Sequence, residues 1–344
     1  MEVSPSKFNE PEVIGESVQG PGHKTNNIEC QDNWSAKAGE NYVVAAVGDG
    51  LGTASRSAEG SQLATKIAVK KLTQWLQSDE VDVENVSQSE AKDAFQSAII
   101  HARKRIETVA AEFDNDLNQY HTTLSVVCNT PNWYAAIAIG DSGVVGITVD
   151  DTYRRLVDRE DSSSSSATVP LTGSPTLVKE KNRFDFDQTG MQTVVLFSDG
   201  LDRFAWSLEN KSEPRQEFFG RLQDFITHID SLSSEKAKSD FREFVDSDEF
   251  HNYSSDDKTL VVAHLPQATS RTTSSPSGRK KFSDREFKNA VESAQQPSIT
   301  EVGEIVGCSH TTAADRLRQL KQDGVLSSRE AGNEILWKVD QSGE

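Results

Sequence analysis

The stretch YVVAAVGDGLGTAS, residues 42–55, places an apolar run directly before an aspartate set among glycines. A run of this kind predicts a buried β-strand that ends at Gly48. Asp49 and Gly50 follow, and both residue types are common in ordinary turns. An aspartate at a strand end can also hold a metal ion or support a phosphate-binding loop. The stretch alone leaves both interpretations open.

Two further carboxylate positions share this arrangement, far away in the sequence. Asp199 follows the apolar run TVVLFS and precedes Gly200, while Asp256 and Asp257 directly precede the run KTLVVAHL. Mg²⁺ and Mn²⁺ prefer oxygen ligands, so carboxylates gathered at the edge of a sheet would suit them. A glycine after Asp49 and after Asp199 permits close approach of the backbone, whose carbonyl can itself become a ligand. A metal site and a set of ordinary turns remain the two alternatives.

The distribution of apolar residues before position 266 predicts an α+β fold, in which strands and helices are segregated rather than alternating. The predicted strands cover residues 42–48, 122–128, 133–139, 144–149, 193–197 and 259–265. The predicted amphipathic helices cover residues 57–76, 90–113, 217–229 and 235–245. Short connections within residues 122–149 favour antiparallel pairing of the strands there.

The bulk composition narrows the functional classes. The chain has 344 residues, enough for about two domains, and a net charge of −18, which disfavours membrane surfaces and nucleic-acid binding by the chain as a whole. We hypothesise that this acidity reflects a halophilic, high-salt cytoplasm. Three scattered cysteines without a CxxC pair, Cys30, Cys128 and Cys308, argue against a disulfide framework and a structural zinc site. With no apolar stretch near the ~20 residues that span a bilayer, we expect a cytoplasmic protein.

Six motifs occur in one order along residues 15–265. They are GHKTNNIECQDNW, VVAAVGDGLGTASRSAEGSQLAT, HTTLSVV, YAAIAIGDSGVVGI, VVLFSDGLD and SDDKTLVV. Together they resemble the metal-dependent protein phosphatases of the type 2C family (PPM), and more closely its divergent prokaryotic branch, which has QD where the main branch has ED. The resemblance implies an antiparallel β-sandwich flanked by helices. It also implies a centre of two Mn²⁺ or Mg²⁺ ions, with a third possible, at one end of the sandwich.

The resemblance assigns catalytic and metal-binding roles residue by residue. Asp32 looks like the aspartate of the first motif, and Asp49 resembles the bridging metal ligand, with the carbonyl of Gly50 beside it. Asp199 and Asp256 look like the remaining carboxylates of the two-metal core. These four aspartates form the expected catalytic set.

A third metal site is only partly represented in the sequence. Asp141, in GDSG, resembles a ligand of the family's weaker third metal ion. Its second acidic ligand is expected about four positions after Asp199, where this chain has Arg203, with Asp202 one place early. The resemblance therefore supports the two-metal core more strongly than the third site.

The phosphate-binding position also departs from the family. The arginine that clamps the phosphate in many members would fall near Asn27 and is absent. His23 or Lys24 could replace its charge, and both could equally be ordinary polar surface residues. Leu51 occupies the position of a histidine that often follows the aspartate–glycine pair, which excludes a histidine general acid there.

The activity implied by the resemblance is that of a serine/threonine protein phosphatase. Such an enzyme hydrolyses phosphoprotein monoesters with a metal-activated water and needs no protein nucleophile. Cys30 and Cys128 are not in a cysteine-dependent phosphatase loop. The implied partners are a phosphorylated protein and a protein kinase. The alternatives are a catalytically inactive phosphatase-like module that binds phosphoproteins and a transcriptional regulator.

The sequence pattern changes after a segment rich in Ser, Thr and Pro. This change predicts two domains, residues 1–265 and 282–344, joined by a linker at residues 266–281. The last segment predicts three short helices and a hairpin. It resembles the winged helix-turn-helix domains of prokaryotic regulators, particularly acidic ones of salt-adapted archaea.

A winged helix suggests DNA binding through the helix that begins near His310. The side chains expected to face DNA are Thr311, Thr312, Arg316 and Arg318. Residues 280–344 carry 9 Lys and Arg against 11 Asp and Glu, so this segment is much less acidic than the rest but not basic. Because phosphate neutralisation dominates DNA affinity, protein docking or dimerisation remains the alternative.

Overall fold

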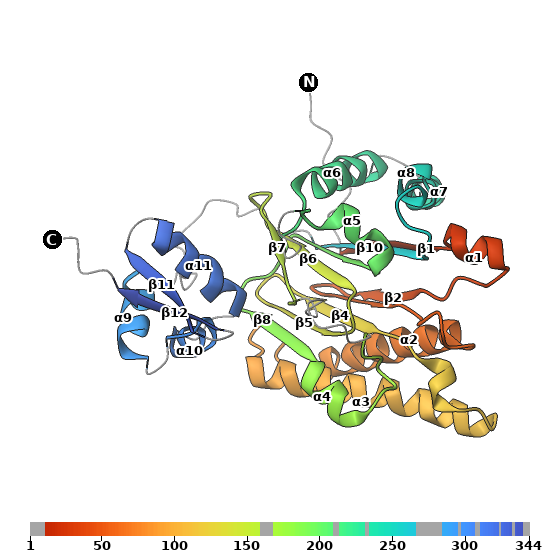
Figure 1. Ribbon diagram of the computed structural model, residues 1–344, viewed down its shortest axis with the longest axis horizontal. Coiled ribbons are helices and arrows are strands. Elements are labelled where there is room, and N and C mark those ends of the chain that lie inside the picture. The colour runs from red at the N-terminus through yellow and green to blue at the C-terminus, as the bar shows by residue number, and fades with distance from the viewer. Residues whose placement is uncertain are drawn as a thin grey trace. The chain divides into compact units, whose positions relative to one another are not determined.

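The computed structural model describes residues 11–158, 168–208, 213–230, 234–265, 284–294, 297–306, 310–322, 325–331 and 334–339. The chain divides into two compact units, Met1–Gln267 and Ala268–Glu344 (Figure 1). The segment expected to be a linker, residues 266–281, lies outside the described residues, as does Cys308. No helix among the described residues is both long and apolar enough to cross a membrane.

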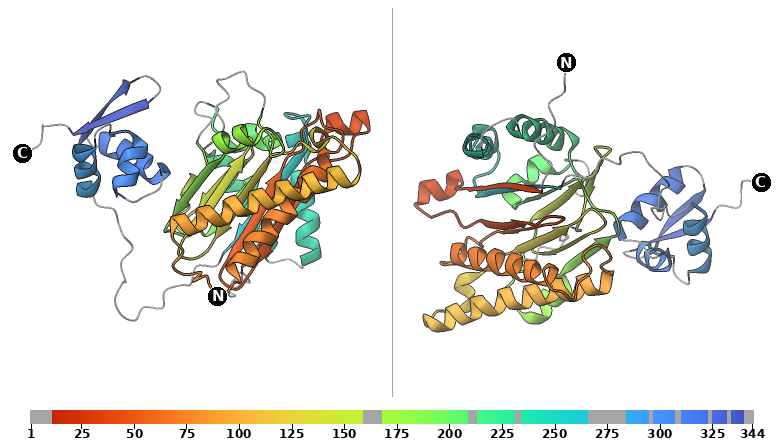
Figure 2. Two further views of the ribbon diagram at one scale, coloured as in Figure 1. Left: turned by 90° about the horizontal axis from the view of Figure 1, so that it is seen from below. Right: turned by 180° about the vertical axis from the view of Figure 1, so that it is seen from behind.

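Two five-stranded antiparallel sheets form the first unit, and they pack face to face (Figures 1 and 2). The first sheet has the order β1 (Glu12–Val18), β10 (Lys258–His264), β9 (Thr193–Phe197), β6 (Gly143–Ile147) and β7 (Tyr153–Arg155). The second has the order β2 (Asn33–Ala38), β3 (Val43–Gly48), β4 (Leu124–Asn129), β5 (Tyr134–Ile139) and β8 (Arg183–Asp187). The fold is therefore a mixed α+β fold with antiparallel sheets, as expected.

Helices cover the outer face of each sheet (Figure 2). The long helices α2 (Ser57–Leu76) and α3 (Gln88–Glu112) pack on the sheet that contains β3. On the other sheet lie α5 (Asp202–Ala205), α6 (Gln216–Asp230), α7 (Ser234–Val245) and α8 (Asp248–His251). Further short helices of this unit include α1 (Pro21–Asn26), η1 (Leu117–Tyr120) and α4 (Pro175–Lys181). All four predicted helices are confirmed.

The strand β3 shows how the sequence produces these layers. Because successive side chains of a strand point to opposite faces, Val44 and Ala46 enter the core beneath α2 and α3. Val43, Ala45 and Val47 enter the core between the two sheets. Both faces are buried, which explains why the strand is a continuous apolar run rather than an alternating one.

The six predicted strands are the three central strands of each sheet. The four strands that the sequence did not reveal, β1, β2, β7 and β8, are the four sheet edges. One expectation needs correction: β5 and β6 are consecutive but do not pair. The chain changes sheets between them, at residues 140–142, so that β6 pairs with β7 and β9.

The second unit contains α9 (Asp284–Ser293), α10 (Ile299–Val306), α11 (His310–Gln322) and an antiparallel hairpin of β11 (Leu326–Ala331) and β12 (Glu334–Val339). Its small core includes Phe287, Leu317 and Trp337. The N–H of Glu301 donates to the Oγ of Ser298 at 3.2 Å, as expected for an N-terminal cap of α10. Residues 332–333, between the two strands of this hairpin, lie outside the described residues.

Candidate functional site

Three aspartate side chains meet at one end of the two sheets. Asp49 follows β3, Asp141 follows β5, and Asp199 begins the short helix η2 (Asp199–Leu201) after β9. Each offers a carboxylate oxygen, and these oxygens all lie within 4.8 Å of one another. The strands β3 and β5 belong to one sheet and β9 belongs to the other, so the packing of the two sheets creates this cluster. We refer to these residues as the acidic trio.

The backbone around Asp49 is held by two threonines that directly precede β4. The N–H of Asp49 donates to the Oγ1 of Thr123 at 3.0 Å, and the N–H of Thr123 donates to the carbonyl of Asp49 at 2.8 Å. The hydroxyl of Thr122 donates to the same carbonyl at 3.1 Å. The neighbouring Gly50 cannot carry a side chain without movement, because its Cβ would lie 2.7 Å from the carbonyl oxygen of Gln31. The backbone of Asp49 and Gly50 is therefore tightly fixed.

Asp32 lies beside the acidic trio but outside it. The side chain is 4% exposed, and its Oδ2 accepts a hydrogen bond from the Oγ1 of Thr259 at 3.0 Å. Burial raises the pKa of Asp32 to about 8, although a hydrogen bond from Ser198 opposes the shift; the charges of Asp257 and Asp199 add to it. The structure thus brings Asp32 into the same electrostatic environment as the trio.

Asp256 also approaches the trio without joining it. It lies exposed just before β10, and its Oδ1 accepts a hydrogen bond from the N–H of Asp257 at 2.9 Å. Its charge is among those that raise the pKa values of Asp49 and Asp199. Among the described residues, the tightest group therefore contains the expected third-metal residue Asp141 in place of Asp32 and Asp256.

The electrostatics of the trio favour a bound cation. Burial raises the pKa of Asp199 to about 7, and the charges of Asp141 and Asp256 add to this shift. Burial, followed by the charges of Asp32 and Asp199, raises the pKa of Asp49 well above its usual value. Like charges held this close destabilise one another, and an all-oxygen donor set is the kind that Mg²⁺ and Mn²⁺ prefer. The residues present therefore fit a divalent metal ion.

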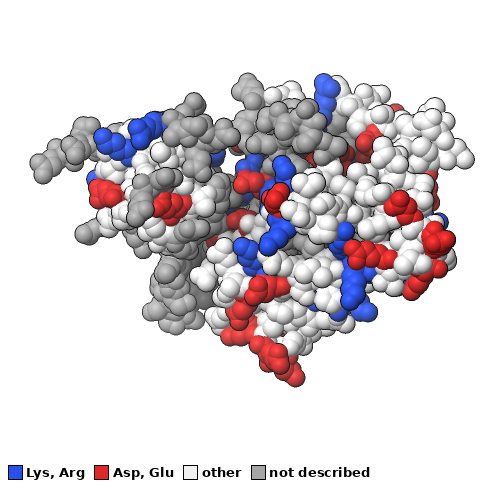
Figure 3. Space-filling model, turned by 60° about the horizontal axis from the view of Figure 1, so that its bottom comes forward, with Lys and Arg blue, Asp and Glu red and all other residues white. Residues whose placement is uncertain are grey.

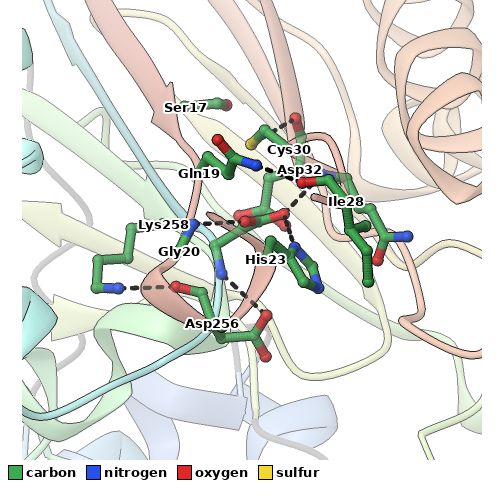
Figure 4. Close-up of polar contacts among 12 residues, drawn as sticks. Ser17, Gln19, Gly20, His23, Ile28, Cys30, Asp32, Asp256 and Lys258 are labelled. Atoms are coloured by element: carbon green, nitrogen blue, oxygen red, sulfur yellow. Dashed lines mark hydrogen bonds and ion pairs between the residues drawn. The ribbon is translucent and has the colours of Figure 1, made fainter. Parts of the chain in front are cut away.

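The two basic residues expected to contact phosphate are engaged with carboxylates. The Nδ1 of His23 lies 2.9 Å from the Oδ2 of Asp257, and the Nζ of Lys24 lies 3.1 Å from the Oδ1 of Asp246. Figure 4 shows His23 among the polar residues that surround the start of β10. Their role in phosphate binding remains a prediction.

Near the position expected for the third metal ion, the side chains of Asp202 and Arg203 contact aromatic residues. The Nε1–H of Trp206 donates to the Oδ1 of Asp202 at 2.9 Å. The guanidinium of Arg203 lies over the ring of Tyr253, 4.7 Å from its centroid. Asp202 still contributes to the raised pKa of Asp199.

Sequence reasoning did not assign a role to Asp257. The sequence did contain a signal, because both Asp256 and Asp257 directly precede a predicted strand. Only Asp256 was assigned as a metal ligand. Asp257 is the buried member of the pair, whereas Asp256 is exposed.

The residues expected to contact DNA lie on α11. Arg318 is exposed and Arg316 is half-buried. The side chains of Thr311 and Thr312 are outside the described part of the unit. The helix has its apolar side buried through Ala313, Leu317 and Leu320.

Comparison with known proteins identifies similar chains. A family model described as protein phosphatase 2C matches residues 19–246. Serine/threonine-protein phosphatase 3 of Escherichia coli (strain K12) is 21% identical over 257 residues, which cover 73% of this chain and 97% of the relative.

Two solved structures are among the similar chains. A C. elegans sex determining protein is 14% identical, with 76% of this chain and 66% of that chain covered and a TM-score of 0.50. The Mycobacterium tuberculosis serine/threonine phosphatase PstP/Ppp is 17% identical, with 74% and 99% covered and a TM-score of 0.47.

Proposed function

This chain belongs to the protein phosphatase 2C family, and we propose that it is a Mn²⁺- or Mg²⁺-dependent protein serine/threonine phosphatase. The observation that carries the proposal is the acidic trio, whose carboxylate oxygens lie within 4.8 Å of one another. The family is Mn²⁺- or Mg²⁺-dependent, and the trio provides the donor set that such an ion needs. The proposed substrate is a phosphoserine or phosphothreonine ester of a protein.

In the proposed mechanism, four aspartates would hold two metal ions: Asp49, Asp199, Asp32 and Asp256. The carbonyl of Gly50 would add a ligand beside Asp49. Asp141 would be available to a third ion. The bound ions would activate a water for attack on phosphorus and offset charge on the phosphoryl oxygens. The hydrogen bonds of Thr123 and Thr259 fix the positions of Asp49 and Asp32. Hydrolysis forms a bond from the water oxygen to phosphorus, breaks the ester bond and returns a proton to the serine or threonine oxygen.

For the substrate phosphate we propose His23 as the principal contact. Its ring is placed by Asp257, next to the proposed ligand Asp256. Lys24 is the weaker candidate of the two, because Asp246 already pairs with its ammonium group. Leu51 offers no proton donor beside Asp49.

The experiment that tests this function measures phosphate release from a phosphothreonine peptide, first with Mn²⁺ and then with excess EDTA. We expect turnover with Mn²⁺ that EDTA abolishes, and little turnover of a phosphotyrosine peptide. Turnover that persists unchanged in EDTA would contradict a metal-dependent mechanism.

A second candidate function is a non-catalytic module that binds phosphoproteins. It is favoured by Asn27, which stands where many relatives have the phosphate-clamping arginine, and by the pairing of Lys24 with Asp246. Binding of a phosphopeptide and of Mn²⁺ without any turnover would support this alternative.

For the second unit we propose a winged helix-turn-helix that binds DNA or docks a protein. Three helices followed by an antiparallel hairpin support this proposal, together with the exposed Arg318 on α11. We also propose the domain division 1–265, 266–281 and 282–344, membership of the divergent prokaryotic branch, a cytoplasmic location and a protein kinase as the opposing enzyme.

A gel shift of the full chain with mixed-sequence DNA tests the DNA-binding proposal. We expect a salt-sensitive shift that Arg318→Glu weakens. Absence of any shift at low salt would leave protein docking as the role of this unit.

A further inference from the structure

A buried carboxylate outside the proposed ligand set joins two distant segments of the chain. Asp257 is 2% exposed. Its Oδ1 accepts a hydrogen bond from the N–H of Gly20 at 2.7 Å, and its Oδ2 accepts one from the N–H of Gln31 at 2.6 Å. The Nδ1 of His23 lies 2.9 Å from the same Oδ2. A buried carboxylate is tolerated only with partners of this kind, because an unpaired buried charge is costly.

The adjacent lysine has a different set of partners. The Nζ of Lys258 donates to the carbonyl oxygens of Ser254 at 3.0 Å and Asp256 at 2.7 Å. The carboxylate of Asp257 instead accepts hydrogen bonds from two backbone N–H groups and has the imidazole of His23 beside it, and all three groups belong to residues 20–31.

These contacts fasten the segment between β1 and β2 to the start of β10. Gly20 and Gln31 lie 237 and 226 positions from Asp257 in the sequence. The N–H of Gly22 donates to the carbonyl of Ser255 at 2.8 Å, so the two backbones are in direct contact. Figure 4 shows Gly20, His23 and Asp32 of one segment gathered beside Asp256 and Lys258 of the other.

Each segment carries a proposed metal ligand next to this contact. Asp32 directly follows Gln31, and Asp256 directly precedes Asp257. The carboxylate of Asp32 accepts from Thr259 at 3.0 Å, and the carboxylate of Asp256 accepts from the N–H of Asp257 at 2.9 Å. Both proposed ligands are thus oriented by residues at the start of β10, Asp257 just before the strand and Thr259 within it, and a shift of Asp257 would move one ligand relative to the other.

We propose that Asp257 is a positioning residue, which sets Asp32 against Asp256 and fixes the imidazole of His23 beside them. The inference rests on the proposed function, because it assigns Asp32 and Asp256 to the metal centre and His23 to the phosphate. Asp257→Asn would disrupt these hydrogen bonds without changing the size of the side chain. An amide side chain has one acceptor oxygen and presents an NH₂ group at the other position, so it can serve only one of the two N–H groups.

The test compares the full-length wild type with Asp257→Asn and with a matched control, Asp185→Asn. Asp185 is also a buried carboxylate, which accepts a hydrogen bond from the hydroxyl of Tyr134 at 2.7 Å, but it lies on β8 outside the acidic trio. Titration calorimetry with Mn²⁺ alone is expected to show a Kd raised about tenfold or more for Asp257→Asn. The control is expected to keep its Kd within about twofold of the wild type.

A second variant tests the role of the His23 imidazole separately from that of the Asp257 carboxylate. His23 lies near the surface, with a side chain 16% exposed, so His23→Gln is expected to fold. We expect it to raise the KM for a phosphothreonine peptide several-fold while the Kd for Mn²⁺ is unchanged, because the imidazole positions phosphate rather than metal.

The outcomes separate this inference from the proposed function. Wild-type protein that neither binds Mn²⁺ nor releases phosphate would overturn both. Wild-type activity with an unchanged Mn²⁺ Kd in Asp257→Asn would overturn the positioning role alone. If Asp257→Asn does not fold, His23→Gln decides, and an unchanged KM there overturns the inference.

Discussion

At the scale of single residues, the fold holds the three carboxylates of the acidic trio close together although like charges repel one another. The carboxylates of Asp49, Asp141 and Asp199 have oxygens within 4.8 Å of one another. In the protein without metal, burial, followed by the charges of Asp141 and Asp256, raises the pKa of Asp199 to about 7. When the pKa of an acid is higher in the folded protein than in the unfolded chain, its ionisation costs the folded protein stability. The cost is absent below the unfolded-state pKa of about 4 and is complete above the folded-state pKa.

We therefore expect Asp199→Asn to stabilise the metal-free protein at pH 8 and to leave its stability at pH 4 nearly unchanged. The gain should be on the order of 1–3 kcal/mol, since one unit of pKa corresponds to about 1.4 kcal/mol. Urea unfolding in EDTA at the two pH values measures it. The exposed Asp79→Asn serves as the control, and equal effects of the two substitutions at pH 8 would contradict the proposed repulsion.

The sequence predicted Asp49 and Asp199 as site residues because each follows a buried strand and precedes a glycine. It did not predict that the group of three carboxylates whose oxygens lie within 4.8 Å of one another would contain Asp141 rather than Asp32 or Asp256. That distance depends on how two sheets pack, which local patterns do not encode. The contacts of Asp257 were not predicted either, because its partners are more than 200 positions away in the sequence.

At the scale of elements, burial determines which strands a sequence reveals. The central strands β3, β4, β5 and β9 are buried along their whole length, and each is an almost continuous apolar run. The edge strands β1, β2 and β7 are mostly half-buried and mix polar with apolar residues. Their conformation is imposed by pairing with a neighbouring strand, which explains why periodicity alone did not predict them.

The helix α3 begins with a capping box, in which Ser87 and Glu90 bond reciprocally to each other's backbone N–H. We expect Ser87→Ala to lower the free energy of unfolding by about 1 kcal/mol without changing the Mn²⁺ Kd. Urea unfolding and calorimetry measure the two quantities. Ser97→Ala, in the middle of the same helix, is the control, and a comparable loss of stability there would argue against the capping interpretation.

At the scale of the whole molecule, net charge is the dominant feature. The chain carries a net charge of −18. Figure 3 shows acidic side chains spread over one face with basic ones between them, rather than gathered in a single patch. Diffuse negative charge of this kind destabilises the compact state through self-repulsion, and salt screens it.

Our hypothesis of adaptation to high salt predicts that the free energy of unfolding is larger in multimolar KCl than in dilute buffer. Urea titrations under the two conditions measure the difference. A matched titration in the presence of Mn²⁺ distinguishes screening of the charge on the whole surface from screening of the repulsion within the acidic trio alone. Equal stability at low and high KCl would refute the hypothesis.

The most direct test of the central claim is the rate of phosphate release from a phosphothreonine peptide in Mn²⁺, compared between the wild type and Asp49→Asn. With Asp185→Asn as the matched control, we expect a loss of turnover of at least about 100-fold for Asp49→Asn and near-normal turnover for the control. Similar turnover by wild type and Asp49→Asn would contradict the assignment of Asp49 to the metal centre.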